Sequence, residues 1–190
     1  MKPMTLSFLA TTTLACAGCA SPTLDAQWRD PQLGPGYLRG ATVLVVCETS
    51  ELVLQRICED QLAAGLKARG ARPVVATAPA GAAAARAAGA KAVFSMGVAV
   101  AAQAVSPGFS IGFGLGGFGS NVGGGVGVSA PVGGGKVSSG YAANGRITDA
   151  AGDRLMWTAR AAAPPSSDVN AQLADLAKAL LDAADKAGLF

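Results

Sequence analysis

The sequence has 190 residues, of which 51% are hydrophobic and only 14% are charged. This composition is too apolar for a disordered chain, and the length suits one domain of ordinary size. The 15 basic and 12 acidic residues give a net charge of +3, and the basic residues form no run or stripe. A nucleic acid is therefore not an expected partner.

The N-terminus has the pattern of a secretory signal peptide. Lys2 precedes a short, mainly apolar run over 4–15, and small residues follow it, which is the order of a signal peptide and its cleavage site. The run is shorter than the ~20 residues that a permanent membrane-spanning helix needs. We expect residues 1–18 to be removed.

The cleavage site resembles a bacterial lipobox, in which the peptidase cuts before a cysteine that carries a diacylglycerol. Ala17 and Gly18 are the small residues before Cys19, and Cys16 stands where the motif usually has Leu. Two or three acyl chains hold a protein firmly on a membrane, so the membrane is the first expected partner, through lipid on Cys19. Ala20 is not Asp, which by the same resemblance implies the inner leaflet of the outer membrane. The alternative is an ordinary signal peptide cleaved near Ala20.

Residues 19–40 are interpreted as the lipidated N-terminus and a tether. The segment 20–40 contains three prolines, three glycines and little periodicity. Trp28 and Tyr37 are expected to fix it to the body of the protein. A single periplasmic domain is expected over 41–190.

The domain begins with a β-α-β pattern. The continuous β-branched and apolar run over 41–47 predicts a strand buried on both faces. Residues 51–69 predict a helix, and 72–78 predict a second strand, parallel to the first through a right-handed crossover. The helix has its apolar stripe at Leu54, Ile57, Cys58, Leu62 and Leu66.

The remaining elements complete an α/β fold. Residues 80–91 predict a short Ala-rich helix and 92–105 a long strand. Residues 140–163 predict a hairpin with its turn at 149–153, and 166–190 predict an amphipathic helix. The fold class is α/β, an α+β sandwich in which a β-α-β-α-β half is followed by antiparallel strands and a C-terminal helix.

The Gly-rich insert over 107–136 is not expected to bind phosphate. Gly112, Gly114 and Gly117 match GxGxxG, but no helix follows and no acidic residue lies ~20 positions further on, as a dinucleotide site requires. A P-loop fails at 135–136, because the Gly and the Ser or Thr of that motif are missing.

A glycine-rich hairpin explains the insert better. Large residues alternate with glycines, which is the period of a strand, and the turn is expected near 120–121. Two interpretations remain open, a flexible hairpin and a surface that docks a partner. The docking residues would be Ile111, Phe113, Leu115 and Phe118.

Two cysteines remain inside the expected domain, Cys47 and Cys58. A disulfide is allowed in an oxidising periplasm, but it needs the two Cα atoms within ~7 Å, and a helix packed on its own strand makes this awkward. Two buried thiols are the favoured alternative.

Catalytic chemistry is missing from the sequence. There is no His, which excludes Ser-His-Asp and Cys-His catalysis and His-metal sites. Glu59 and Asp60 are adjacent on a helix and point apart, so they are interpreted as a solvated face and not as a carboxylate pair. No metal, cofactor or enzymatic activity is expected.

Four segments of the chain resemble those of a known group of proteins. They are the strand at 41–47, the Glu-Asp-x-Leu stretch at 59–62, the Ala-Arg-Gly helix end at 68–70 and the Leu-Met-Trp of 155–157. Over about residues 40–190 the chain resembles small proteobacterial envelope lipoproteins, whose periplasmic domain is similar to the N-terminal domain of TolB and the core of CsgG. The resemblance implies a non-enzymatic role in envelope assembly or maintenance.

Three hypotheses follow. The first is an outer-membrane lipoprotein that works through contact with an envelope protein. The second is a periplasmic module that binds a small ligand or peptidoglycan in a cleft near 48–50. The third is a hydrolase that uses Glu48 or Glu59. The sequence does not predict the oligomeric state.

Overall fold

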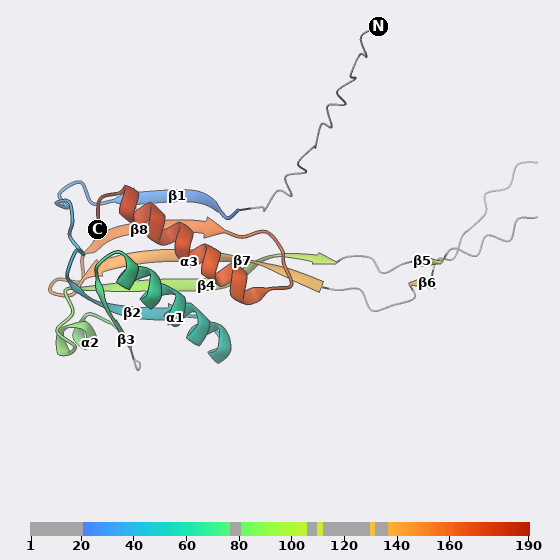
Figure 1. Cartoon of the computed structure of the whole chain (residues 1–190), viewed down its shortest axis with the longest axis horizontal. Coiled ribbons are helices and arrows are strands. Elements are labelled where there is room, and N and C mark those ends of the chain that lie inside the picture. The colour runs from blue at the N-terminus through green and yellow to red at the C-terminus, as the bar shows by residue number, and fades with distance from the viewer. Residues whose placement is uncertain (1–20, 77–80, 106–109, 112–129, 132–136) are drawn as a thin grey trace, which may run out of the picture.

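The computed structural model describes residues 21–76, 81–105, 110–111, 130–131 and 137–190 (Figure 1). Strands and helices follow one another in the order β1 (Thr23–Arg29), β2 (Thr42–Glu48), α1 (Leu52–Ala68), β3 (Arg72–Val75), α2 (Ala82–Ala87), β4 (Ala92–Val105), β5 (Ser110–Ile111), β6 (Ala130–Pro131), β7 (Val137–Asp149), β8 (Leu155–Ala162) and α3 (Val169–Lys186). Among these residues, no helix is long and apolar enough to cross a membrane.

Six strands form one mixed sheet in the order β1-β8-β7-β4-β2-β3. Strand β2, next to the edge strand β3, pairs in parallel with β3 and β4, and the remaining pairs are antiparallel. The predicted α/β class is therefore confirmed, with a parallel β-α-β-α-β half, an antiparallel half and a C-terminal helix.

Helices α1 and α3 lie side by side over one face of the sheet (Figure 1). Each helix presents its apolar stripe to the strands, as the sequence predicts, and the ion pair between Arg69 and Asp182 joins the two helices. Trp157 and Phe94 meet edge to face in the middle of this layer, with their ring centroids 6.1 Å apart. Fully buried side chains of this core include Phe94, Met96, Ile147, Trp157, Leu62, Leu66, Leu173, Leu176 and Leu180.

Gly145 in β7 allows the helix layer to approach the sheet closely. A Cβ atom at this position would lie 3.2 Å from both a Leu180 methyl group and the Trp157 ring. Such contacts are tighter than native packing tolerates without movement of the neighbours. The glycine therefore permits the largest aromatic side chain of the core to lie beneath α3.

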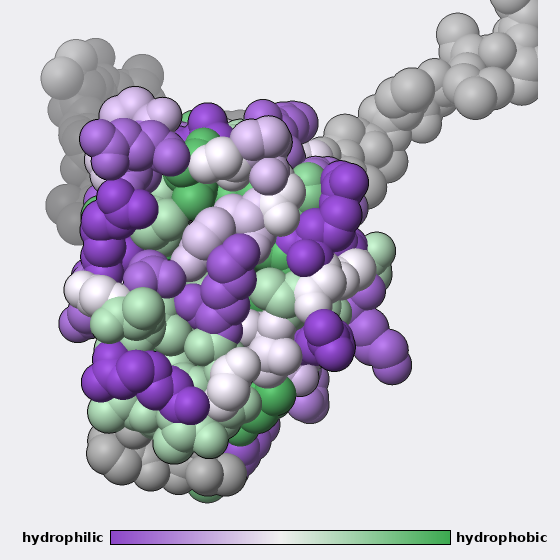
Figure 2. All heavy atoms as spheres, turned by 90° about the vertical axis from the view of Figure 1, so that its left-hand side faces the viewer, coloured by the Kyte–Doolittle hydropathy of each residue, from purple (hydrophilic) through white to green (hydrophobic). Residues whose placement is uncertain are grey.

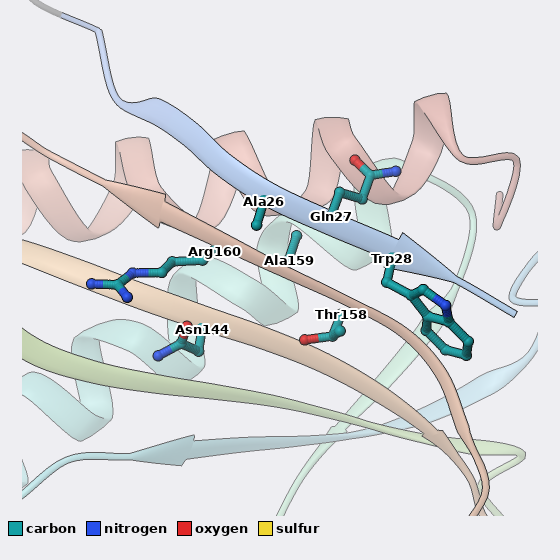
Figure 3. A pocket seen from close by; sticks show the side chains of 7 residues that line it. All are labelled: Ala26, Gln27, Trp28, Asn144, Thr158, Ala159 and Arg160. Atoms are coloured by element: carbon teal, nitrogen blue, oxygen red, sulfur yellow. The ribbon is translucent and has the colours of Figure 1, made fainter.

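The opposite face of the sheet is covered only in part. Leu44 and Val93 point to this side and pack with Ala85 of α2, so β2 is buried on both faces, as its apolar run predicts. Over β1, β8 and β7, no helix of the described chain covers this face (Figure 3). This uncovered area is where the candidate site lies.

The interpretation of 19–40 as a tether is wrong for most of its length. Residues 23–29 form the edge strand β1, which pairs with β8, and Leu38 is fully buried in the main core. The backbone N–H of Leu38 donates to the carbonyl of Leu189 at 2.7 Å. Pro31, Pro35, Gly36 and Gly40 lie in turns within the domain.

Candidate functional site

The predicted lipid anchor Cys19 lies outside the described residues, as do Phe113, Leu115 and Phe118 of the predicted docking surface. Ile111 lies in β5, whose two residues pair antiparallel with β6. The pairs Ser110↔Pro131 and Ile111↔Ala130 are centred between positions 120 and 121. This register agrees with the predicted position of the hairpin turn, although the turn itself lies outside the described residues.

Cys47 and Cys58 are joined in a disulfide, with their Cα atoms 6.1 Å apart. Cys47 is the last inward-facing residue of β2, and Cys58 faces the sheet from the second turn of α1. The expectation of two separate thiols is therefore wrong. Both side chains project into the core between the sheet and α1, where the end of β2 and the start of α1 lie close together. The bridge fixes α1 to the end of β2.

The carboxylates considered for catalysis do not form a reactive pair. Glu59 is only 2% exposed, so its assignment to a solvated helix face is wrong. Its carboxylate accepts a hydrogen bond from Gln55 at 2.9 Å and pairs with Arg56 at 2.8 Å. Glu48 is exposed at the end of β2, and in the described part of the chain no three His, Cys, Asp or Glu residues gather to hold a metal.

The long strands β4 and β7 extend beyond the rest of the sheet as a two-stranded ribbon (Figure 1). Strand β2 accompanies β4 only as far as Gly97, whereas the β4–β7 pairing continues to Val105↔Val137. We call residues 98–105 and 137–141 the ribbon. On its β7 side, the loop after β8 bonds to the carbonyls of Ser139 and Tyr141. On its β4 side, no described strand pairs with the outer edge.

Large exposed apolar side chains lie at the same end of the molecule as the ribbon. Leu52 and Val53, at the start of α1, are 67% and 69% exposed, and Val100 in the ribbon is 53% exposed. The N-terminal end of the described chain also lies here, because Ser21 and Ala101 border one hollow of about 380 Å³. Ala101 of the ribbon and Ser21 therefore lie close together.

A shallow cavity of about 190 Å³ lies on the uncovered face of the sheet. Trp28, Thr158, Arg160 and Asn144 project from neighbouring strands on the side away from the helices (Figure 3). We call this site the shelf. It is lined by Ala26, Gln27, Trp28, Asn144, Thr158, Ala159 and Arg160.

A polar cluster closes the end of the sheet opposite the ribbon. The Tyr37 hydroxyl donates to Asp149 at 2.6 Å, and Lys91 lies 4.1 Å from the centroid of the Tyr37 ring. The hydrogen bond from Tyr37 holds the pKa of Asp149 below its ordinary value, while burial raises the pKa of Tyr37. Figure 2, which views this end, shows hydrophilic side chains with smaller apolar patches between them. The cluster joins the first loop to the β7–β8 turn and is structural.

The shelf does not follow from the sequence pattern, in which Trp28 falls within the segment interpreted as a tether. The sequence does carry a signal for a solvated sheet face in β7 and β8. Polar residues occupy alternate positions there, at Asn144 and Arg146 and at Thr158 and Arg160. The signal in β1 was weaker, because the strand is short and is followed by Pro31.

No protein family matches the sequence, and no curated protein matches it significantly. Among solved structures, two forms of the PelC dodecamer from Paraburkholderia phytofirmans resemble the chain, with TM-scores of 0.51 and 0.53 and 16% identity. They cover 84% of this chain and 97% and 96% of PelC. At this identity, the likeness shows a shared fold only.

Two further structures are more distant. Lipoprotein GNA1162 from Neisseria meningitidis matches with a TM-score of 0.44 and 15% identity, over 77% of this chain and 99% of its own. TolB from Acinetobacter baumannii matches with a TM-score of 0.37 and 12% identity, over 86% of this chain and 31% of its own. The solved structures similar to this chain thus include a bacterial lipoprotein and TolB, but scores this low carry no argument about function.

Proposed function

We propose that the chain is a non-catalytic lipoprotein of the outer membrane that acts in envelope assembly or maintenance through protein contacts. The ribbon is the observation that carries this proposal. A two-stranded ribbon alone is marginally stable in water. The outer edge of β4, with which no strand of the described residues pairs beyond Gly97, offers backbone N–H and C=O groups to another chain. A protein partner that covers this edge and the exposed Val100 would stabilise the ribbon and pair its backbone N–H and C=O groups.

The position of the anchor supports a contact close to the membrane. If Cys19 carries the lipid, it is only two positions from Ser21, a distance of about 7 Å at full extension. Ser21 borders the same hollow as Ala101 of the ribbon. The part of the ribbon around Ala101 would then lie near the membrane surface, where other envelope proteins are concentrated.

Copies of this chain are the first partners to consider. The PelC structures that share the fold are dodecamers, and Leu52, Val53 and Val100 give this end of the molecule an apolar surface that association would bury. We therefore propose that the ribbon end makes contacts between copies.

A non-catalytic role agrees with the chemistry of the described residues. The buried carboxylate of Glu59 is neutralised by a hydrogen bond and an ion pair, and the whole sequence lacks His.

Light scattering on the full chain purified from membranes in detergent tests the contact. We expect an oligomer for the native chain and a shift toward monomer for Val53→Glu and Val100→Glu, because each places a charge in the contact. Val74→Glu is the matched control, since Val74 is also an exposed valine but lies on the opposite edge strand β3. A monomeric native chain, or an oligomer that neither variant weakens, contradicts contacts between copies.

Contacts with other envelope proteins need a separate measurement in cells. A photo-reactive residue at Ala101 should crosslink to a defined protein, identified by mass spectrometry, and the same residue at Ala88 should not. Ala88 is an exposed alanine at the end of α2, away from the ribbon. If Ala101 captures neither a second copy nor a defined envelope protein, the proposed role through protein contacts is wrong.

A further inference from the structure

The indole ring of Trp28 is an exposed apolar platform in polar surroundings. The side chain is 46% exposed, and in the described chain its ring makes no aromatic or cation–π contact. A large aromatic left half in water beside a cavity indicates a site for a ligand that has a flat apolar face. The C–H face of a pyranose ring has this property.

Hydrogen-bonding side chains lie beside the platform at the spacing of the sheet. In the register of the sheet, Trp28 of β1 lies opposite Thr158 of β8, and Thr158 lies opposite Arg146 of β7. Two residues further along β8, Arg160 lies opposite Asn144 of β7. Adjacent strands are about 4.8 Å apart and alternate residues about 6.8 Å apart. The Asn144 amide is exposed and has no described hydrogen-bond partner, so it offers both donors and an acceptor. Such an array suits the hydroxyl and N-acetyl groups of a sugar chain.

The charge of the shelf favours a ligand with carboxylates. Within the shelf, the Nε atom of Arg160 lies 3.7 Å from the Oδ2 atom of Asp25. Arg146 lies beside the shelf, because it pairs with Thr158 across β7 and β8, and it is exposed with no ion pair in the described structure. Glu48, the nearest other carboxylate in register, lies two strands beyond Asn144. One guanidinium therefore remains uncompensated, and it can bind a carboxylate in the bidentate manner that arginine prefers.

The size of the cavity favours one unit of a long chain. Its volume of about 190 Å³ is below the ~300–1,000 Å³ of pockets that enclose drug-sized ligands. The uncovered face continues from the shelf across β8 and β7 (Figure 3), so a chain that places one ring on Trp28 can extend over the sheet.

Other occupants fit the shelf less well. A bilayer would meet the end of the molecule that bears Ser21, whereas Trp28 lies five residues further along β1 than Thr23, about 17 Å away. A peptide that extends the sheet would need a regular edge, but the register of β1 is interrupted between Leu24 and Ala26.

We propose that the shelf binds cell-wall glycan from which the stem peptides have been removed, with one sugar ring stacked on Trp28 and the free lactyl carboxylate of a neighbouring sugar held by Arg146 and Arg160. The inference rests on the proposed function only for the compartment in which the chain meets this glycan. It assigns the uncovered sheet face to the wall and leaves the ribbon end for protein contacts.

Titration of the full chain in detergent with peptide-free glycan strands, built of alternating N-acetylglucosamine and N-acetylmuramic acid, tests the proposal. The chain has two tryptophans, and Trp157 is fully buried, so a saturable change in emission reports on Trp28. The matched probe is the N-acetylglucosamine tetramer, which lacks the lactyl carboxylate. We expect it to bind at least about tenfold more weakly than the strands, because an arginine–carboxylate contact is lost.

Calorimetry on variants assigns the contacts. Trp28→Ala should weaken binding of the strands about tenfold, as truncation of a central aromatic does, and Trp28→Phe should retain most of it. Arg146→Gln combined with Arg160→Gln should weaken binding of the strands but not of the tetramer. Arg39→Gln, which removes an exposed arginine elsewhere, should change neither.

Three results overturn the proposal: no binding of strands by the native chain, equal binding by Trp28→Ala with an unchanged unfolding temperature, or a change in Trp28 emission with phosphatidylglycerol vesicles but not with strands. The oligomeric state of the same preparation is measured by light scattering. A chain that binds strands but stays monomeric contradicts only the contacts between copies, and an oligomer that ignores strands contradicts only the shelf.

Discussion

Reduction of the Cys47–Cys58 disulfide should destabilise the domain by an amount that follows from the loop it closes. The cysteines are 11 positions apart, and the loop-entropy relation gives about 2.8 kcal/mol at 25 °C for a loop of this length. With a urea m-value of about 2 kcal/mol/M, the midpoint should fall by about 1.4 M. In a chain of this size, the unfolding temperature should fall by about 6–12 °C.

Urea unfolding with and without a thiol reductant, followed by the emission of buried Trp157, measures this effect. The variant with both Cys47→Ala and Cys58→Ala is the control, because its midpoint should be low and insensitive to the reductant. Alkylation of the unfolded, unreduced protein followed by mass spectrometry should leave both cysteines unmodified. The reasoning is refuted if reduction is complete by mass spectrometry and the native chain keeps its midpoint within about 0.2 M, a small fraction of the expected shift.

Two further predictions follow from contacts in the structure, and a third follows from the lipobox in the sequence. Gly145→Ala should lower the free energy of unfolding, measured in urea, by about 1–3 kcal/mol through overpacking. Gly97→Ala is the control and should change this free energy little, because an added Cβ there meets nothing within 4 Å. An equal loss in both variants contradicts the close-packing argument. Tyr37→Phe should destabilise by about 1 kcal/mol near neutral pH. The pKa of Asp149 is lowered and that of Tyr37 is raised in the folded chain. The difference from the native chain should therefore shrink as the pH falls from the ordinary aspartate pKa toward the lowered pKa of Asp149, and as the pH rises from the ordinary tyrosine pKa toward the raised pKa of Tyr37. A difference independent of pH would contradict the assignment. Cys19→Ser should abolish incorporation of labelled fatty acid and release the chain from outer-membrane fractions, and persistent labelling would contradict the anchor.

The sequence predicted the elements whose signal is local. The stripes of α1 and α3 and the buried run of β2 have periodicities that depend only on which faces are apolar, and each was found within a few residues of its observed bounds. The disulfide was judged awkward because sequence spacing does not show how close the end of a strand and the start of its helix lie. Its geometry depends on the packed layer, which the sequence does not specify.

The shelf could not be predicted for a different reason. β1 is only seven residues long and nearly all of them are exposed, so it has no buried face to produce an alternating pattern. It becomes a strand because it pairs with β8, far away in sequence. A site built from Trp28 and Arg160 therefore exists only once this long-range pairing is known.

The same pairing sets the order in which the chain can complete its fold. β1 is the first strand to be synthesised, yet in the described sheet its partner is β8, the last strand, and the loop after β1 is held by the residues that follow α3. Contacts of such high sequence separation form slowly, and here they cannot form until nearly the whole chain is present. If the chain is exported as the proposed function requires, this arrangement would keep the domain open until nearly all of the chain has crossed the membrane.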